Sequence, residues 1–260
     1  MTHRERYYWD LSGHLVVPGV LTSDEVAAAN EALDHADDRM TNGKDAYAAF
    51  LRETANAAWL DGHFVRTRPE APFLLMLEPP HCEPFRRMLV HPEIVGRLRE
   101  MCGAGFRLDS GPVFIGGVVG TSVHKLHGAG EPHKPYVSHD SPSGAFFAGG
   151  VTVAYLLADS GPDDGGFACV PGSHKSRYPI PPGVRTMEDD LGCVENLRSR
   201  QATPCSSWMV HRPTAPDPGG PHIRGGRFYS SMRAAPLPAE DPQSATSNPN
   251  SSGIPKSLRA

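Results

Sequence analysis

A histidine-rich segment in the middle of the chain contains residue types that can bind a metal ion. It reads HKLHGAGE over residues 124–131, and four histidines, His124, His127, His133 and His139, fall within a short stretch. Imidazole nitrogens are the commonest protein ligands for transition metals, although most histidines are ordinary hydrogen-bonding side chains. Residues three apart on a strand lie on opposite faces, so His124 and His127 would share one metal only if the chain bends between them.

The elements that must position this segment begin near the N-terminus. The stretch GHLVVPGVLTSDEVAAANEALD predicts a short strand over 14–17, a turn at Pro18-Gly19 and then an amphipathic helix. Thr22 and Glu25 have the spacing of a capping box, in which each side chain satisfies a backbone N–H of the first helical turn. The apolar face of this helix is predicted to contain Val26, Ala29 and Leu33.

Helical and strand patterns then separate along the chain. Residues 82–102 predict two helices divided at His91-Pro92, because proline begins a helix but cannot continue one, with Gly103 as the C-terminal stop. Strands are predicted over 112–119, 150–157, 167–170 and 205–211, where short β-branched and aromatic runs alternate with glycine. This order predicts helices packed on a β-sandwich or barrel.

Composition limits the class of protein. The 260 residues suit one large domain, predicted over 1–236; the remainder, 237–260, is rich in Pro, Ser and Asn and is predicted to be a disordered tail. A net charge of -4 without a Lys/Arg block argues against nucleic-acid or membrane partners. The N-terminus lacks the apolar core of a signal peptide, and the five cysteines are scattered. We therefore expect a cytoplasmic protein with reduced thiols.

Three stretches resemble the phytanoyl-CoA dioxygenase family. They are GHLVVPGVLTSDEVAAANEALD, CEPFRRMLVHPEIVGRLREMCGAGFRLD, and GGFACVPGSHK over residues 165–175. The resemblance implies a mainly β fold with flanking helices, a double-stranded β-helix (jelly roll, cupin-like), and the cofactors Fe(II) and 2-oxoglutarate. In that family two histidines and a carboxylate bind the iron on one side and leave positions open for 2-oxoglutarate and O₂.

The resemblance also implies site residues. His127 is the expected proximal ligand, with His124 second; His211, at the end of an apolar run, is the expected distal ligand, with His222 second. Arg227, with Arg224 as the alternative, is expected to bind the distal carboxylate of 2-oxoglutarate, because a planar guanidinium can bind both carboxylate oxygens. His174 in PGSHK is instead expected to serve in a tight turn.

The chain departs from the family pattern at the third iron ligand. Where the family has His-x-Asp, this sequence has His127-Gly-Ala129, and alanine cannot bind iron. Glu131 or Asp140 could supply the carboxylate. Alternatively the position is vacant, as in related iron halogenases where chloride binds, or the chain is a non-catalytic jelly-roll relative. The sequence predicts a 2-oxoglutarate-dependent dioxygenase that hydroxylates or otherwise oxidises a C–H bond of a small organic substrate with O₂.

Overall fold

The computed structural model describes most of the chain up to residue 197 and two later strands. The described residues are 1–55, 58–60, 63–66, 73–117, 126, 148–157, 167–176, 178–197, 204–207 and 225–233. The predicted tail at 237–260 lies outside them. Among the described residues, no helix has the length and apolar character needed to cross a membrane.

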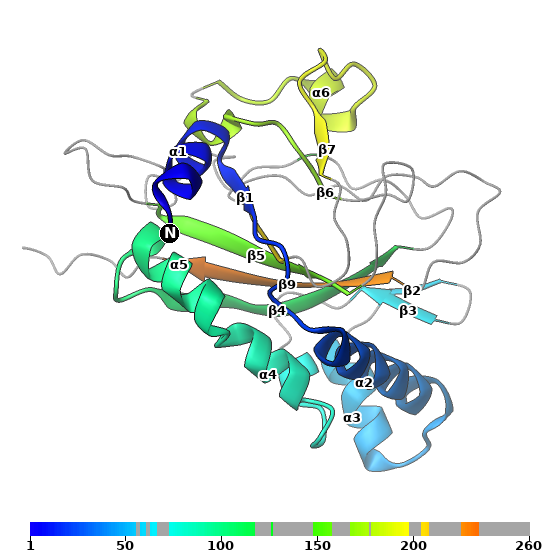
Figure 1. The fold of residues 1–260 in the computed structure, drawn as a ribbon. Helices are drawn as coiled ribbons and strands as arrows, with labels where there is room; N and C mark the ends of the chain where they lie inside the picture. Colours follow the sequence, from blue (N-terminus) through cyan, green and yellow to red (C-terminus); the bar gives the residue numbers. More distant parts are fainter. Residues whose placement is uncertain are drawn as a thin grey trace, which may run out of the picture.

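Most of the helices lie on one side of a large antiparallel sheet (Figure 1). The α-helices are α1 His3–Ser12, α2 Ser23–Asn42, α3 Ala46–Ala55, α4 Glu83–Leu89, α5 Pro92–Cys102 and α6 Pro182–Thr186, with 3₁₀ turns η1 Phe73–Leu75 and η3 Ser173–Lys175. In Figure 1, α2 to α5 lie on one side of the sheet and α6 lies on the other. Helix α1 contacts α5 through an ion pair between Glu5 and Arg97.

The described strands form two sheets. They are β1 His14–Val16, β2 Ala58–Leu60, β3 His63–Arg66, β4 Arg107–Gly117, β5 Gly150–Leu156, β6 Phe167–Cys169, β7 Glu195–Leu197, β8 Pro204–Ser207 and β9 Gly225–Arg233. Seven of them form a sheet in the order β1-β8-β5-β9-β4-β3-β2, and β6 pairs with β7. All the pairings are antiparallel. Strands distant in sequence thus lie side by side, with β9 between β4 and β5.

Local signals in the sequence explain the helix ends. Thr22 caps α2 in a capping box with Glu25, as predicted. Helix α4 stops before His91, α5 begins at Pro92, and Gly103 follows α5 as expected. The predicted turn at Pro18-Gly19 is present, and Gly19 has a φ of +72°, which favours glycine.

Two hydrophobic cores lie on opposite sides of the large sheet. The larger core joins the helices to one face of β5 through Val151, Val153 and Tyr155. A smaller core lies on the other side, where Ala154 of β5 packs with Ala168 of β6. Successive residues of a strand face opposite ways, so β5 separates the two cores.

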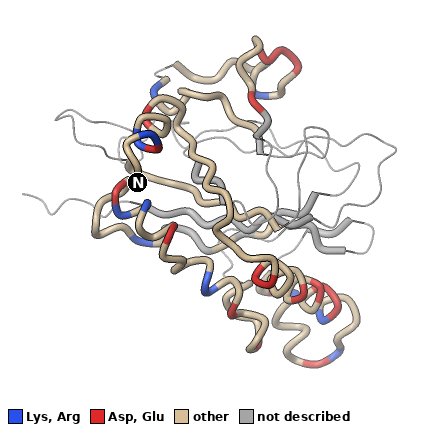
Figure 2. The backbone as a smooth tube through the Cα atoms, in the orientation of Figure 1, with Lys and Arg blue, Asp and Glu red and all other residues tan. Residues whose placement is uncertain are grey.

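Charged side chains of the described residues lie at the periphery. Figure 2 shows acidic residues along α2 and again in the turn that follows α6. The smaller core, in contrast, is built from apolar residues and cysteines. The face of β5 that carries Ala154 is therefore covered by apolar side chains.

Candidate active site

Most of the predicted site residues lie outside the described part of the chain. This group comprises His127, His211, Glu131 and Arg224, together with the alternatives His124, His222 and Asp140. Arg227 belongs to the described strand β9. The structure therefore describes the framework next to these residues, and Leu126 is the closest described neighbour of His127.

Leu126 is buried in the smaller core. Its exposed fraction is 0%, and it belongs to one cluster with Ala154 of β5, Ala168 of β6 and Val184 of α6. These residues come from the large sheet, the small sheet and the helix beside them. The chain is thus anchored between the two sheets one residue before His127.

Backbone hydrogen bonds also hold Leu126. Its N–H donates to the carbonyl oxygen of Arg185 at 2.9 Å, and Nη1 of Arg185 donates to the carbonyl oxygen of Leu126 at 3.4 Å. Arg185 is in α6, a five-residue helix that begins at Pro182. One residue of α6 therefore binds both polar groups of the Leu126 backbone.

Strand pairing assigns Arg227 to a face of the large sheet. Arg227 is opposite Leu156, and Tyr229 is opposite Ala154, with no irregularity in this ladder. Directly opposed residues of an antiparallel pair share a face, and alternate residues of a strand do too. The register position of Arg227 is therefore on the face that carries Ala154, the face against which Leu126 packs.

Strand β8 lies in the same part of the sheet. Cys205 pairs with Ala154 on one side and with Val16 of β1 on the other. Val16 packs against the smaller core, which agrees with the face assigned to Ala154. His211 follows β8 in the sequence, and the predicted strand over 205–211 is described as far as Ser207.

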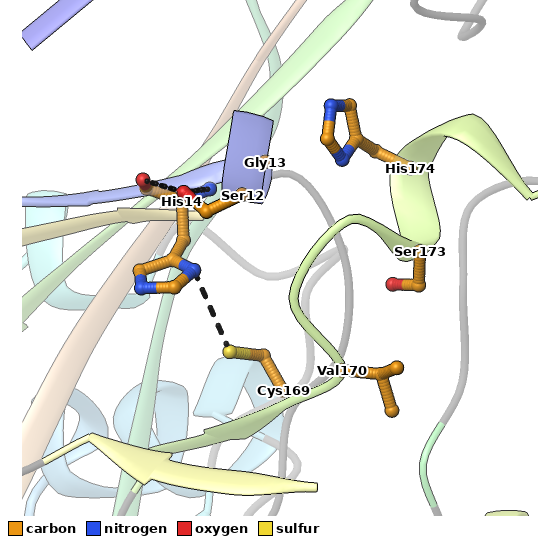
Figure 3. A pocket seen from close by; sticks show the side chains of 7 residues that line it. All are labelled: Ser12, Gly13, His14, Cys169, Val170, Ser173 and His174. Atoms are coloured by element: carbon orange, nitrogen blue, oxygen red, sulfur yellow. Dashed lines mark hydrogen bonds between the residues drawn. The ribbon is translucent and has the colours of Figure 1, made fainter. Parts of the chain in front are cut away.

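A hydrogen-bonded chain of three side chains joins α1, β1 and β6. The hydroxyl of Tyr8 lies 3.0 Å from Nε2 of His14, and Nδ1 of His14 lies 3.7 Å from Sγ of Cys169. Figure 3 shows the His14–Cys169 contact at the edge of a small hollow. The hollow is too small to admit a water-sized sphere, so it is a packing feature rather than a substrate pocket.

Burial favours the neutral forms of His14 and Cys169. The pKa of His14 is lowered by loss of hydration, a shift that the nearby charge of Glu195 opposes. Burial raises the pKa of Cys169 to about 12, so the thiol keeps its proton at neutral pH and is a poor nucleophile. We therefore assign Tyr8, His14 and Cys169 a structural role.

His174 lies in a turn, as predicted. Gly172 precedes η3 with a φ of +78°, and Nε2 of His174 lies 3.1 Å from the carbonyl oxygen of Asp10. Lys175 forms an ion pair with Asp10 at 3.3 Å. The Pro-Gly-Ser-His-Lys motif thus fastens the end of β6 to α1. Within the described residues, no group of three His, Cys, Asp or Glu side chains could hold a metal ion.

Sequence reasoning did not identify Tyr8, His14 or Arg185. His14 belongs to a predicted strand with apolar neighbours, a pattern from which its burial could have been predicted. Arg185 had no local signal, because its partner Leu126 lies 59 residues away in the sequence.

The fold is similar to that of solved iron and 2-oxoglutarate oxygenases, which are jelly rolls. HygX from Streptomyces hygroscopicus, solved with nickel and 2-oxoglutarate bound, is 17% identical, with a TM-score of 0.67 over 90% of this chain and 88% of that chain. AviO1 from Streptomyces viridochromogenes Tue57 is 15% identical, with a TM-score of 0.61 over 90% and 95%. EctD from S. alaskensis, solved with bound Fe, is 15% identical, with a TM-score of 0.63 over 90% and 77%.

These similarities confirm the predicted jelly-roll fold, whereas the mainly β content stays a prediction because long stretches of the chain, such as 127–147 and 208–224, lie outside the described residues. A search of curated proteins gave no match. The family model for phytanoyl-CoA dioxygenase matches residues 9–205, which include the N-terminal strand and helix and the Pro-Gly-Ser-His-Lys turn. This chain therefore belongs to the phytanoyl-CoA dioxygenase family.

Proposed function

We propose that this protein is an Fe(II)- and 2-oxoglutarate-dependent oxygenase that oxidises a C–H bond of a small organic substrate. The observation that carries the proposal is that Leu126, next to His127 in the sequence, packs on the face of the large sheet where Arg227 has its register position. Family membership supports the same reading.

The donor set fits iron. His127, His211 and a carboxylate would provide two imidazole nitrogens and one oxygen, the combination that suits Fe(II) and leaves positions free for a cosubstrate and O₂. HygX was solved with iron in one structure and with nickel and 2-oxoglutarate in another. Bound iron would supply the oxidation chemistry, and the protein would orient the substrate and exclude water.

Arg227 suits the distal carboxylate of 2-oxoglutarate. A guanidinium can donate two parallel hydrogen bonds to one carboxylate, and this geometry fixes the orientation of the bound acid. Strand β9 is central in the sheet, paired with β4 and β5, so its backbone is held on both sides. A residue on such a strand is a better positional anchor than Arg224, which precedes it.

The third iron ligand is proposed to be Glu131. It follows His127 in the same segment and is a carboxylate, which Ala129 is not. Substitution separates the alternatives: Glu131→Gln should abolish tight Fe(II) binding if Glu131 is the ligand, whereas Asp140→Asn should do so if Asp140 is. If neither matters and chloride changes the product, Ala129 marks a halide site.

The proposed reaction balances as hydroxylation. A substrate R–H, 2-oxoglutarate and O₂ give R–OH, succinate and CO₂, with one oxygen atom entering the product and the other entering succinate. HygX was also solved with hygromycin B bound, which supports a small organic molecule as the substrate class here. We do not propose hygromycin B itself.

The test needs no knowledge of the substrate. The protein is incubated with Fe(II), 2-oxoglutarate and ¹⁸O₂, and succinate is measured by mass spectrometry during uncoupled turnover. We expect succinate that contains one ¹⁸O atom, and we expect His127→Ala to lower its rate to that of iron without protein. Equal succinate formation by wild type and His127→Ala contradicts the assignment. No succinate from either protein supports the non-catalytic alternative.

A further inference from the structure

We propose that Arg185 is a positioning residue that holds the metal-binding segment in place through the backbone of Leu126. The inference rests on the proposed function, because its purpose is to fix His127. It names a residue of α6, outside the predicted ligands and the family-like motifs. The physical basis is a pair of hydrogen bonds between Arg185 of α6 and the backbone of Leu126.

Helix α6 is held rigidly. Pro182 fixes the first turn, and the N–H of Arg185 donates to the carbonyl of Pro181 at 2.9 Å. Past the helix, Met187 has a left-handed φ of +63°, and its N–H donates to the carbonyl of Val184. Val184 is buried in the smaller core. Helix α6 is therefore a short element closed by hydrogen bonds at both ends and anchored by one apolar side chain.

Leu126 is held through its backbone and its side chain. Its N–H donates to Arg185, its carbonyl accepts from the Arg185 guanidinium, and its side chain is fully buried. These three contacts restrict both translation and rotation of the residue. Because the peptide that joins Leu126 to His127 is planar, with Cα atoms about 3.8 Å apart, fixing the Leu126 carbonyl also restricts where the next residue begins.

Fixing Leu126 should affect the metal affinity of the neighbouring ligand His127. Groups that orient a ligand without touching the metal typically change metal affinity about 10- to 100-fold when removed. The Arg185 guanidinium is proposed to act through a backbone carbonyl, so we expect the lower end of that range. Removing it leaves the part-buried Leu126 carbonyl without its charged donor, while the bond to the Arg185 carbonyl remains.

The test compares Arg185→Met with the wild-type protein. Methionine keeps an aliphatic stem but cannot donate a hydrogen bond. Ni(II) affinity is measured by calorimetry without oxygen turnover, and the visible spectrum of the Co(II)-loaded protein reports ligand geometry. We expect Arg185→Met to bind Ni(II) about ten-fold more weakly with an altered Co(II) spectrum, and Arg185→Lys to regain part of the affinity.

Arg52→Met is the matched control. Arg52 also donates from its guanidinium to backbone carbonyls, those of Met40 at 2.8 Å and Gly43 at 3.0 Å, in the helical layer on the other side of the sheet. It should lower stability without changing Ni(II) affinity. If Arg185→Met binds Ni(II) as tightly as the wild type and gives the same Co(II) spectrum, the positioning role is wrong while the proposed function stands.

A second measurement covers the case in which Arg185→Met does not fold. Hydrogen exchange of the wild-type protein is followed with and without Ni(II). Because coupling between two sites is reciprocal, metal binding should slow exchange at Leu126 and in α6 together. Slower exchange at Leu126 without any change in α6 contradicts the inference. Absence of Ni(II) binding by the wild type would instead overturn the proposed function and the positioning role with it.

Discussion

Ala154 and Tyr155 are neighbours on β5 but belong to different parts of the protein. Tyr155 faces the helices, where its hydroxyl donates to the carbonyl of Met88 at 2.6 Å, and it is 1% exposed. Ala154 lies in the smaller core with Leu126. A substitution at Tyr155 should therefore affect stability, whereas a substitution on the face that carries Ala154 should affect the proposed site.

Tyr155→Phe tests this separation. Removing the hydroxyl leaves the buried Met88 carbonyl without that donor, which should lower the free energy of unfolding by about 1–3 kcal/mol. Binding of 2-oxoglutarate should not change. Tyr178→Phe is the control, since Tyr178 is 86% exposed, and it should leave stability unchanged. Denaturant unfolding measures both; equal stability of Tyr155→Phe and the wild type would contradict the role of this hydrogen bond.

Arg227→Met tests the other side of β5. Loss of a bidentate, charge-assisted contact should weaken 2-oxoglutarate binding about 10- to 100-fold, because hydrogen bonds to charged groups contribute about 1.5–3 kcal/mol. Arg233→Met, at the far end of β9, is the matched control and should bind normally. Anaerobic titration of the Fe(II)-loaded protein with 2-oxoglutarate measures the affinity. If both variants bind as the wild type does, Arg224 becomes the better candidate.

At the scale of elements, the junction between α1 and β1 depends on close packing against η3. Gly13 ends α1 with a φ of +76°, and a Cβ atom there would lie 2.2 Å from Nδ1 of His174. Gly19 has a similar φ of +72° but no atom within 4 Å of its Cβ position. Comparing Gly13 with Gly19 therefore separates the effect of backbone strain from that of steric overlap.

Gly13→Ala should therefore destabilise the protein more than Gly19→Ala. A left-handed φ costs an alanine about 1–2 kcal/mol at either position, and overpacking adds about 1–3 kcal/mol at Gly13 only. Thermal and denaturant unfolding of the two variants provide the comparison. Equal losses of stability would mean that His174 moves aside freely and that η3 is not packed tightly on α1.

Some helices and strands could be predicted from the sequence and others could not. Capping boxes, proline starts and glycine stops are local, so the start of α2 and the bounds of α4 and α5 were predicted closely. Helix α1 has an equivalent capping box at Thr2 and Glu5 but was not predicted, because its apolar pattern is weak. Strands β2, β3 and β7 are short and pair with distant or irregular partners, which no local pattern specifies.

At the scale of the whole molecule, Leu126, the described residue of the segment that the sequence identified as chemically important, packs with residues of both sheets. The family and the jelly-roll fold could be predicted from the Pro-Gly-Ser-His-Lys turn and the N-terminal strand and helix. The contacts of Leu126 could not be predicted, because their partner Arg185 lies 59 residues further along the sequence. The domain bounds 1–236, the tail and the individual ligands stay predictions.

Stability should decrease as the pH falls below about 6.5. The pKa of His14 is lowered from its ordinary value of 6.5 by burial, and that of His35 is lowered by burial and by the neighbouring charges of His81 and Arg39. Since the unfolded chain binds protons more readily than the folded one, this contribution is complete above 6.5 and is lost as the pH falls through the folded pKa values.

Urea unfolding between pH 7.5 and pH 5 measures this dependence. His35, which stacks on His81 with ring centroids 3.7 Å apart, can be replaced by glutamine to remove one titrating group. The His35→Gln protein should lose less stability on acidification than the wild type. His3→Gln, at an exposed position of α1, should behave as the wild type does. A steeper loss in His35→Gln would contradict the sign of the effect.

The proposed function requires this chain to bind Fe(II) through His127, with 2-oxoglutarate beside it. The most direct measurement is the visible absorption of the protein on anaerobic addition of Fe(II) and 2-oxoglutarate, for wild type, His127→Ala and His174→Ala. We predict a metal-to-cosubstrate charge-transfer band that His174→Ala retains and His127→Ala loses. Absence of the band from the wild type, or an undiminished band in His127→Ala, would contradict this requirement.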